Sequence, residues 1–380
     1  MEKSKLSNSA IETVKDTEKN CIGCKLCMEH CPMLNKFCSS PKELLKNIVK
    51  GEEVDPSIPY SCTLCNYCNV VCPNDVSLKN AFLDMRKDLF SREKSKIKEL
   101  GYNTVKNHQK NSFSKIFSTS IKGFEDEKVH RKRSVFFPGC SLSSYSPDIV
   151  LRTYDYLKEK LPEVGIMQNC CGKPTYSMGD MEQFKEYSKK LEKEFSDNNI
   201  DEIIVACQNC FKTFEVSSNV KVTSLWEIIS NYGIPNEVRG IGKGIDLSFA
   251  IHDPCPTRYE RIIHDSIRDI TNQLGLKIKE MEFSREKTLC CGSGGMLNVT
   301  NNSLAQSQMK KRANQADTDH ILSYCEECVE SMKRGGKQSF HILDLLFNTH
   351  IYSTFTQKDQ GTIKKWINRY KSKQKINKIK

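Results

Sequence analysis

Between residues 134 and 352, short apolar runs alternate with longer stretches in which apolar residues recur every three or four positions. The short runs are typical of buried strands, and the longer stretches, such as 148–158 and 180–195, are typical of amphipathic helices. This alternation predicts parallel sheets covered by helices. No run approaches 18 consecutive apolar residues, so the pattern predicts no helix that spans a membrane.

The apolar runs occur in two sets with matching spacing. Cys140 and Cys255 follow the first run of each set and are 115 residues apart, whereas Cys207 and Cys325 follow a later run and are 118 residues apart. Two copies of one unit explain these offsets. Ligands bind at the carboxyl edge of parallel sheets, so we expect the two copies to face one another across a shared cleft.

Composition divides the chain into five segments. A helical block with two cysteine runs comes first, a polar connector separates it from the two copies, and a basic tail follows them. The predicted boundaries are 11–90 for the helical block, 91–133 for the connector, 134–240 and 247–352 for the two copies, and 353–380 for the tail.

Charge changes this picture little. The 380 residues include 58 Lys and Arg against 47 Asp and Glu, and this excess, a formal net charge of +11, lies mainly in the connector and the tail. A solvated lysine-rich surface explains it, and docking to an acidic redox partner or to a membrane subunit is the alternative. No motif of nucleic-acid recognition accompanies the charge. The first 20 residues contain no apolar leader, so we expect a cytoplasmic protein, or one held at the inner face of a membrane by a partner.

Cysteine is the informative residue type, because the chain has 19 of them. A disulfide scaffold would be short and exported, so these clustered thiols indicate metal. Two runs have the spacing Cys-x2-Cys-x2-Cys-x3-Cys-Pro of bacterial [4Fe-4S] ferredoxins, in which the fourth cysteine of each run ligates the other cube. Two complete runs, each with its proline, disfavour zinc. The predicted ligands are Cys21, Cys24, Cys27 and Cys72 for cluster 1, and Cys62, Cys65, Cys68 and Cys31 for cluster 2.

Each copy of the repeated unit carries five further cysteines in the order Cys…Cys-Cys-Gly…Cys-x2-Cys. Five thiolates exceed the four that one zinc ion takes, although zinc on four of the five is an alternative for one of the two sites. Cys38 is left over, as a structural thiol or as a spare ligand. The two sets are Cys140, Cys170, Cys171, Cys207 and Cys210 (cluster 3), and Cys255, Cys290, Cys291, Cys325 and Cys328 (cluster 4).

The five-cysteine pattern resembles that of the CCG, or cysteine-rich, domain. A ferredoxin block followed by two such domains, over residues 15–350, resembles the catalytic subunit of heterodisulfide reductase. Similar architectures occur in the iron–sulfur subunits of anaerobic glycerol-3-phosphate dehydrogenase and glycolate oxidase. The resemblance implies an α-helical two-cluster ferredoxin domain followed by two tandem α/β CCG domains, a pseudo-twofold duplication with parallel sheets flanked by helices.

The resemblance also implies a function. In the heterodisulfide reductase family, each five-cysteine set holds a non-cubane [4Fe-4S] cluster, and the two clusters together cleave a disulfide. We therefore expect an oxidoreductase subunit that passes electrons from two [4Fe-4S] cubes to a catalytic pair of clusters on the ten CCG cysteines. The alternative is an electron-transfer subunit of a flavin-dependent lactate, glycolate or glycerol-3-phosphate dehydrogenase complex that feeds quinone. Eight ferredoxin ligands disfavour a purely structural or regulatory metal-binding protein.

The motifs of the sequence indicate which partners the protein needs. The sequence has no flavin or phosphate-loop motif, so we expect a separate electron-donating or flavin-containing redox subunit, a membrane cytochrome or quinone-linked subunit, and a small disulfide or thiol substrate. The glycine-rich segment 292–295 either brings backbone amides to a cluster or forms a plain turn. The residues near the cysteine motifs that could hold an anionic substrate or donate protons are Lys173, His252, Arg258, Arg261 and His341.

Overall fold

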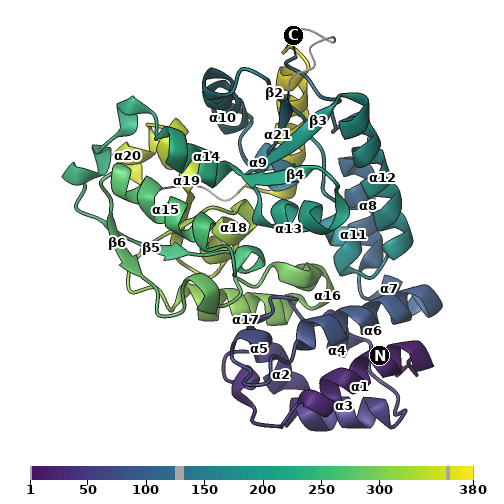
Figure 1. The fold of residues 1–380 in the computed structure, drawn as a ribbon. Coiled ribbons are helices and arrows are strands. Elements are labelled where there is room, and N and C mark those ends of the chain that lie inside the picture. Colours follow the sequence, from purple (N-terminus) through teal and green to yellow (C-terminus); the bar gives the residue numbers. More distant parts are fainter. Residues whose placement is uncertain (1, 125–131, 357–359, 380) are drawn as a thin grey trace.

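The structure is a computed structural model that describes residues 2–124, 132–356 and 360–379. Residues 125–131 of the predicted connector, and residues 357–359 and 380 of the predicted tail, lie outside the described residues. A helical N-terminal part lies below two α/β units that stand side by side (Figure 1). None of the helices within the described ranges is long and apolar enough to cross a membrane.

The N-terminal part is helical, as predicted. Its helices are α1 (Asn8–Asn20), α2 (Pro32–Phe37), α3 (Pro41–Val49), α4 (Ser57–Tyr60), α5 (Tyr67–Val70) and α6 (Leu78–Arg92). The predicted connector forms α7 (Lys94–Glu99) and α8 (Tyr102–Ser112), and α8 lies beside the first α/β unit (Figure 1). The Ser7 hydroxyl accepts a hydrogen bond from an amide at the start of α1, and prolines begin α2 and α3. α1 packs on α3 and α6 around Val14, Leu45 and Met85, which are fully buried.

The first α/β unit is a four-stranded parallel sheet with the strand order β2-β1-β3-β4. Its elements are β1 (Arg133–Phe137), α9 (Gly139–Tyr145), α10 (Pro147–Lys160), β2 (Val164–Ile166), α11 (Lys173–Ser177), α12 (Met181–Asp197), β3 (Ile200–Val205), α13 (Gln208–Ser217), β4 (Lys221–Ser224) and α14 (Leu225–Tyr232). The predicted helices 148–158 and 180–195 correspond to α10 and α12.

The second unit repeats this topology, with the strand order β6-β5-β7-β8. Its elements are β5 (Ser248–His252), α15 (Arg261–Gln273), β6 (Lys277–Glu280), α16 (Leu297–Thr300), α17 (Asn302–Ala313), β7 (His320–Ser323), α18 (Glu326–Arg334), β8 (Gln338–His341) and α19 (Ile342–Phe347), followed by α20 (Ile351–Thr354). The last rung between the central strands pairs Phe137 with Val205 in the first unit and His252 with Ser323 in the second. Phe137 and His252 therefore occupy equivalent positions, each three residues before a cysteine.

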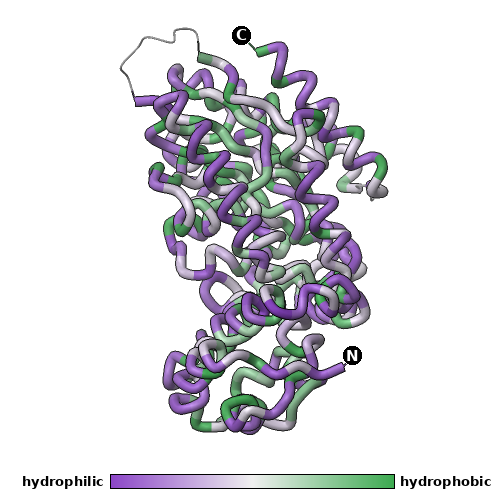
Figure 2. Tube along the Cα trace, turned by 90° about the vertical axis from the view of Figure 1, so that its right-hand side faces the viewer, coloured by the Kyte–Doolittle hydropathy of each residue, from purple (hydrophilic) through white to green (hydrophobic). Residues whose placement is uncertain are grey.

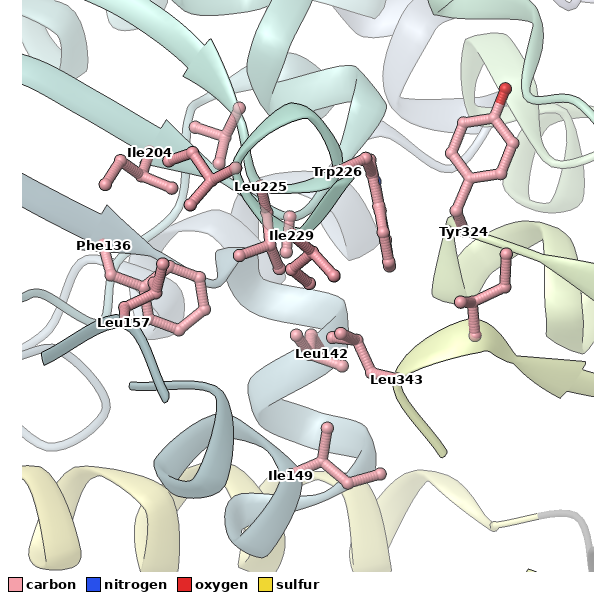
Figure 3. Packing of buried hydrophobic residues seen from close by; sticks show 14 of the residues in the cluster. Phe136, Leu142, Ile149, Leu157, Ile204, Leu225, Trp226, Ile229, Tyr324 and Leu343 are labelled. Atoms are coloured by element: carbon pink, nitrogen blue, oxygen red, sulfur yellow. The ribbon is translucent and has the colours of Figure 1, made fainter. Parts of the chain in front are cut away.

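One hydrophobic core runs through both α/β units. Figure 3 shows Phe136, Leu157 and Ile204 of the first sheet and its helices, with Trp226 on the side that faces the second unit. The Trp226 ring meets the Tyr324 ring edge-to-face, with the ring centroids 5.9 Å apart. Both side chains are fully buried, so the two units share apolar surface that neither could cover alone.

The predicted basic tail forms a packed helix, α21 (Thr362–Ile376), that lies on α9 and α10. Arg369, Ser372 and Ile376 recur every three or four residues and are fully buried, whereas most of its lysines face outward. The prediction from charge overlooked this inward face because two of those three residues are polar. Figure 2 shows hydrophilic positions along the outer helices and hydrophobic positions gathered inside the larger lobe.

Candidate metal centres

The two ferredoxin-type runs have the same backbone geometry. Gly23 and Lys25 of the first run have positive φ angles, and so do Leu64 and Asn66 at the equivalent positions of the second run. Leucine rarely adopts this conformation, so the second run holds a strained backbone that curls the loop around its sulfurs. The Leu64 amide donates to the Cys62 sulfur at 3.4 Å. Strain at this place is typical of a functional site.

The structure groups the eight sulfurs as the spacing predicts. Cys21, Cys24, Cys27 and Cys72 line a cavity of about 20 Å³, which Cys68 also reaches. The second group lines a cavity of about 50 Å³ that also reaches Cys290 of the second α/β unit; its members are Cys31, Cys62, Cys65 and Cys68. The fourth cysteine of each run thus lies with the first three of the other run. The assignment of these cysteines as ligands stays a prediction.

The first five-cysteine set forms a continuous series of sulfur contacts. The Cys140 and Cys170 sulfurs lie 3.9 Å apart. Hydrogen bonds from Cys170 and Cys210 lower the pKa of the Cys171 thiol to about 5. Cys207 precedes α13 and Cys210 is on its first turn, where the backbone amides favour a thiolate. The order of contact is Cys140, Cys170, Cys171, Cys210, Cys207.

The second set repeats this order of contact. The Cys291 and Cys328 sulfurs lie 3.3 Å apart, and Cys325 precedes α18 as Cys207 precedes α13. The Gly292 amide donates to the Cys290 sulfur at 3.3 Å, so the glycine-rich segment brings backbone amides to sulfur as well as forming a turn. The order of contact is Cys255, Cys290, Cys291, Cys328, Cys325.

Cysteine side chains also join one set to the next. A hydrogen bond to Cys290 raises the pKa of Cys65 well above its usual value, so the second ferredoxin run touches the second five-cysteine set. Hydrogen bonds with Cys210 and Cys325 hold the pKa of Cys207 well below its usual value, and the second of these bonds links the two five-cysteine sets. The carboxyl edges of the two sheets therefore face each other through their sulfurs, as the repeat predicted.

The donor sets fit bound iron–sulfur groups. Burial raises the pKa of Cys62 to about 12, although Arg86 lies beside it, and raises that of Cys68 to about 11, so these crowded thiols resist ionisation. A metal deprotonates its thiol ligands and so removes this obstacle. His252 lies within 4.8 Å of the Cys291 and Cys328 sulfurs, and its Nε2 has no partner among the described residues. A buried polar atom of this kind is satisfied by a group bound at the sulfurs.

Comparison with known families identifies the domains of the chain. Residues 18–76 match the 4Fe-4S dicluster domain, and residues 134–215 and 249–333 each match the cysteine-rich domain. The chain is an iron–sulfur protein with one dicluster domain and two cysteine-rich domains. The dicluster domain indicates two [4Fe-4S] clusters, and the cysteine-rich domains suggest further iron–sulfur groups.

The relatives include iron–sulfur proteins and subunits of reductases. An uncharacterized iron–sulfur protein of Methanococcus maripaludis is 25% identical, over 83% of this chain and 68% of that protein. One subunit of the fumarate reductase (CoM/CoB) of Methanothermobacter marburgensis is 24% identical, over 88% of this chain and 73% of that subunit. One subunit of the dihydromethanophenazine:CoB–CoM heterodisulfide reductase of Methanosarcina mazei is 22% identical, over 73% of this chain and 72% of that subunit. The chain is homologous to these reductase subunits.

The dicluster domain is bound to both cysteine-rich domains through Arg86. This fully buried side chain donates to the carbonyls of Pro59 and Cys62 in the dicluster domain, of Ser177 in the first cysteine-rich domain, and of Gly295 in the second. A Cβ atom at Gly295 would lie 2.3 Å from the Cys62 carbonyl oxygen, and glycine there permits this close approach. All three domains therefore meet beside the second ferredoxin run.

Two neighbours of the first cysteine-rich site lie outside that domain's sequence. Gln109 of α8 is fully buried and donates to the Cys170 sulfur at 3.4 Å. Arg369 of α21 donates to the Ser112 hydroxyl and carbonyl, and its charge opposes the effects of Cys170 and burial, which raise the pKa of Cys140. Neither residue belongs to a cysteine motif, and no local signal in the sequence marks either one.

The structure changes the roles expected for residues near the motifs. Arg258 is buried, and its two terminal nitrogens donate to the carbonyls of Cys65, Glu286 and Thr288, which favours a structural role over the binding of an anionic substrate; its Nε has no partner among the described residues. Arg261 is exposed and pairs with Asp265 at the surface.

His341 and Cys38 have local structural roles. The Nδ1 atom of His341 accepts the Leu343 amide at the start of α19. Burial lowers its pKa to about 3, so the ring is neutral at pH 7 and is not a ready proton donor. Cys38 donates to the Leu34 carbonyl at 3.3 Å, as a structural thiol would.

Lys173 lies close to cysteines of both cysteine-rich domains. Burial, and after it the neighbouring cation Lys79, lower its pKa to about 8, while Cys171 and Cys255 oppose the shift. Its ammonium is therefore close enough to cysteines of both cysteine-rich domains to feel their charge, and it lies 4.6 Å from the centre of the Tyr176 ring.

Proposed function

We propose that the chain is an oxidoreductase subunit of the heterodisulfide reductase type, which reduces a disulfide to two thiols or oxidises two thiols to a disulfide. The observation that carries this proposal is the contact between two complete five-cysteine sets. Both sets have the same order of sulfur contacts, and they meet through Cys207 and Cys325. A site for a two-electron reaction needs two one-electron groups close together, and this arrangement supplies the protein side of such a pair.

The reaction balances as RSSR′ + 2e⁻ + 2H⁺ → RSH + R′SH. Non-cubane [4Fe-4S] clusters on the ten cysteines, when bound, would supply one-electron carriers and iron atoms able to hold thiolate sulfur. The chain itself excludes water, because Cys171, Cys210, Cys291 and Cys328 are buried. Lys173 places a positive charge close to cysteines of both sets, where it would favour an anionic thiol or disulfide.

The order of the cysteine sets suggests where electrons enter. Cys24 of the first ferredoxin run is exposed, whereas Cys65 of the second run contacts Cys290 of a cysteine-rich domain. A redox partner would therefore dock at the exposed Cys24, on the helical part that lies below the two α/β units (Figure 1). An electron-donating or flavin-containing subunit fits this role. The homologous reductase subunits belong to proteins of several subunits, which supports a partner of some kind.

The proposal predicts that Cys170→Ser abolishes disulfide reduction. The chain, purified without oxygen, is assayed for oxidation of reduced benzyl viologen by a panel of small disulfides. Loss of Cys170 removes the contact with Cys140 and one ligand of the first cysteine-rich site, so activity should fall to background. Iron analysis should give about sixteen irons per wild-type chain, at four per cluster.

Cys38→Ser is the matched control, because Cys38 donates only to a backbone carbonyl. It should keep both iron and activity. Full activity of Cys170→Ser would overturn the proposal. So would roughly eight irons per wild-type chain, with zinc or nothing in the cysteine-rich domains, because the dicluster domain alone would then remain. The chain would in that case be an electron-transfer subunit, and its native partner would be sought among flavin dehydrogenases.

A further inference from the structure

The second cysteine-rich site contains a histidine that the first site lacks. His252 ends β5 and is paired with Ser323, and the equivalent residue at the end of β1 is Phe137, paired with Val205. Phe137 packs edge-to-face on Phe214 and has no polar atom to offer. Two sites with the same five cysteines therefore differ in one side chain at the same place in the sheet.

The protonation state of His252 follows from its neighbour. The Nε atom of Arg312 lies 3.1 Å from Nδ1 of His252, and both side chains are fully buried. A guanidinium can only donate hydrogen bonds, so Nδ1 must accept and carries no proton. In the neutral ring the proton is then on Nε2, which makes Nε2 a donor.

The His252 ring lies beside two sulfurs of the second site. The ring and the sulfurs of Cys291 and Cys328 lie within 4.8 Å of one another. Nδ1 is occupied by Arg312, and Nε2 has no hydrogen-bond partner among the described residues. A metal-ligating Nε2 would need a free lone pair, which this tautomer does not have, so the geometry favours an N–H group directed at sulfur over a sixth ligand.

We propose that His252 donates a hydrogen bond from Nε2 to a sulfur of the second cysteine-rich site and makes the group bound there easier to reduce than it would be without the histidine. Added electron density on the sulfurs is stabilised by a donor, so the hydrogen bond raises the reduction potential. Arg312 acts through His252 by holding the tautomer. Both are positioning residues. The inference rests on the proposed function in one respect, namely that an iron–sulfur group is bound at the second site.

Substitution of His252 tests this inference by redox titration. The electron paramagnetic resonance signal of the second site is first assigned by its loss in Cys291→Ser, and its midpoint potential is then measured in the holoprotein. His252→Phe installs the residue of the first site and should lower the potential by the equivalent of about tenfold in the reduction equilibrium, or about 59 mV for one electron. His252→Gln should stay close to wild type, because its amide oxygen can accept from Arg312 while its NH₂ group donates to sulfur.

His264→Phe is the matched control. His264 is also buried in the second unit with an unpartnered Nε2, but it is not part of the sulfur group. Its replacement should leave the potential unchanged. An unchanged potential in His252→Phe would overturn the inference, as would equal shifts in His252→Phe and His264→Phe.

Wild-type protein with ¹⁵N-histidine decides the matter even if His252→Phe loses iron. Pulsed resonance measurements of the second-site signal should show a weak nitrogen coupling and a proton coupling that disappears in D₂O. A strong nitrogen coupling, which marks a direct ligand, or no coupling at all would overturn the inference. A wild-type chain with no iron in the second site would instead overturn the proposed function, and the inference with it.

Discussion

Four buried arginines lie beside the cysteine sets. None of them forms an ion pair with a carboxylate within the described ranges; they donate to backbone carbonyls, hydroxyls, Gln315 or His252. A buried charge without a counter-charge is strongly unfavourable, and an iron–sulfur group with thiolate ligands supplies negative charge. The four pairs are Arg86 with Cys62, Arg258 with Cys65, Arg312 with Cys291, and Arg369 with Cys140.

Arg86→Leu should therefore destabilise the holoprotein, because four buried carbonyls lose their donor. The expected loss is at least about 3 kcal/mol in the free energy of unfolding, read as a shift of the denaturant midpoint under anaerobic conditions. Arg92→Leu on the same helix removes a partly exposed ion pair with Asp88 and a hydrogen bond to the Lys5 carbonyl at the surface, and should cost about 0–1 kcal/mol. Equal effects of the two substitutions would contradict this account of Arg86.

Helices outside the cysteine-rich domains complete the first site. α8 supplies Gln109, α21 supplies Arg369, and the two helices are joined by the hydrogen bond from Arg369 to Ser112. Gln168, which precedes the Cys170–Cys171 pair, donates to the Arg369 carbonyl at 2.9 Å. The helix predicted as a tail is therefore a structural neighbour of the cluster ligands.

A chain that ends at Gly361 lacks α21 and should lose iron selectively from the first cysteine-rich site. The expected deficit is about four irons per chain, measured by iron and sulfide analysis, with the resonance signals of the dicluster domain retained. Lys364→Gln with Lys371→Gln removes two exposed charges of α21 and should keep full iron. Loss of iron in this double variant would show that surface charge, and not packing, is what the helix contributes.

At the scale of the whole molecule, the three domains meet at the second ferredoxin run. Arg86 and Arg258 tie the carbonyls of Cys62 and Cys65 to the cysteine-rich domains, and the Tyr60 hydroxyl donates to the Met178 carbonyl at 2.7 Å. These contacts fix the distance between Cys65 and Cys290. The junction therefore holds the second ferredoxin run against the second five-cysteine set.

Arg258→Ala should accordingly lower kcat and leave KM for an anionic disulfide unchanged. Loosening the Cys65 loop misplaces one cysteine set against the next, and a displacement of about 1 Å can cost roughly 100-fold in rate; we expect a fall of tenfold or more. Arg261→Ala, in the same region but exposed, should change neither constant. A raised KM with normal kcat in Arg258→Ala would instead return this arginine to the substrate site.

Local chemistry made much of this protein predictable from sequence. The spacing of the ferredoxin-type cysteines is set by the size of a [4Fe-4S] cube, and the repeat shows itself in offsets of 115 and 118 residues between matching cysteines. Both can therefore be recognised without a structure. The apolar run that precedes Cys255 corresponds to β5, in which four of the five residues are buried. Strands of three or four residues, such as β2 and β6, leave no such signal.

The tertiary structure alone decided which sets touch and which side chains surround them. The contacts of Cys65 with Cys290 and of Gln109 with Cys170 join residues far apart in sequence. No local sequence pattern predicts such contacts, because they form only when the chain folds. For the same reason, Arg258 looked like a substrate-binding residue until its guanidinium was found among carbonyls. The sequence determined which atoms can bind iron and sulfur, and packing determined the order in which those sites meet.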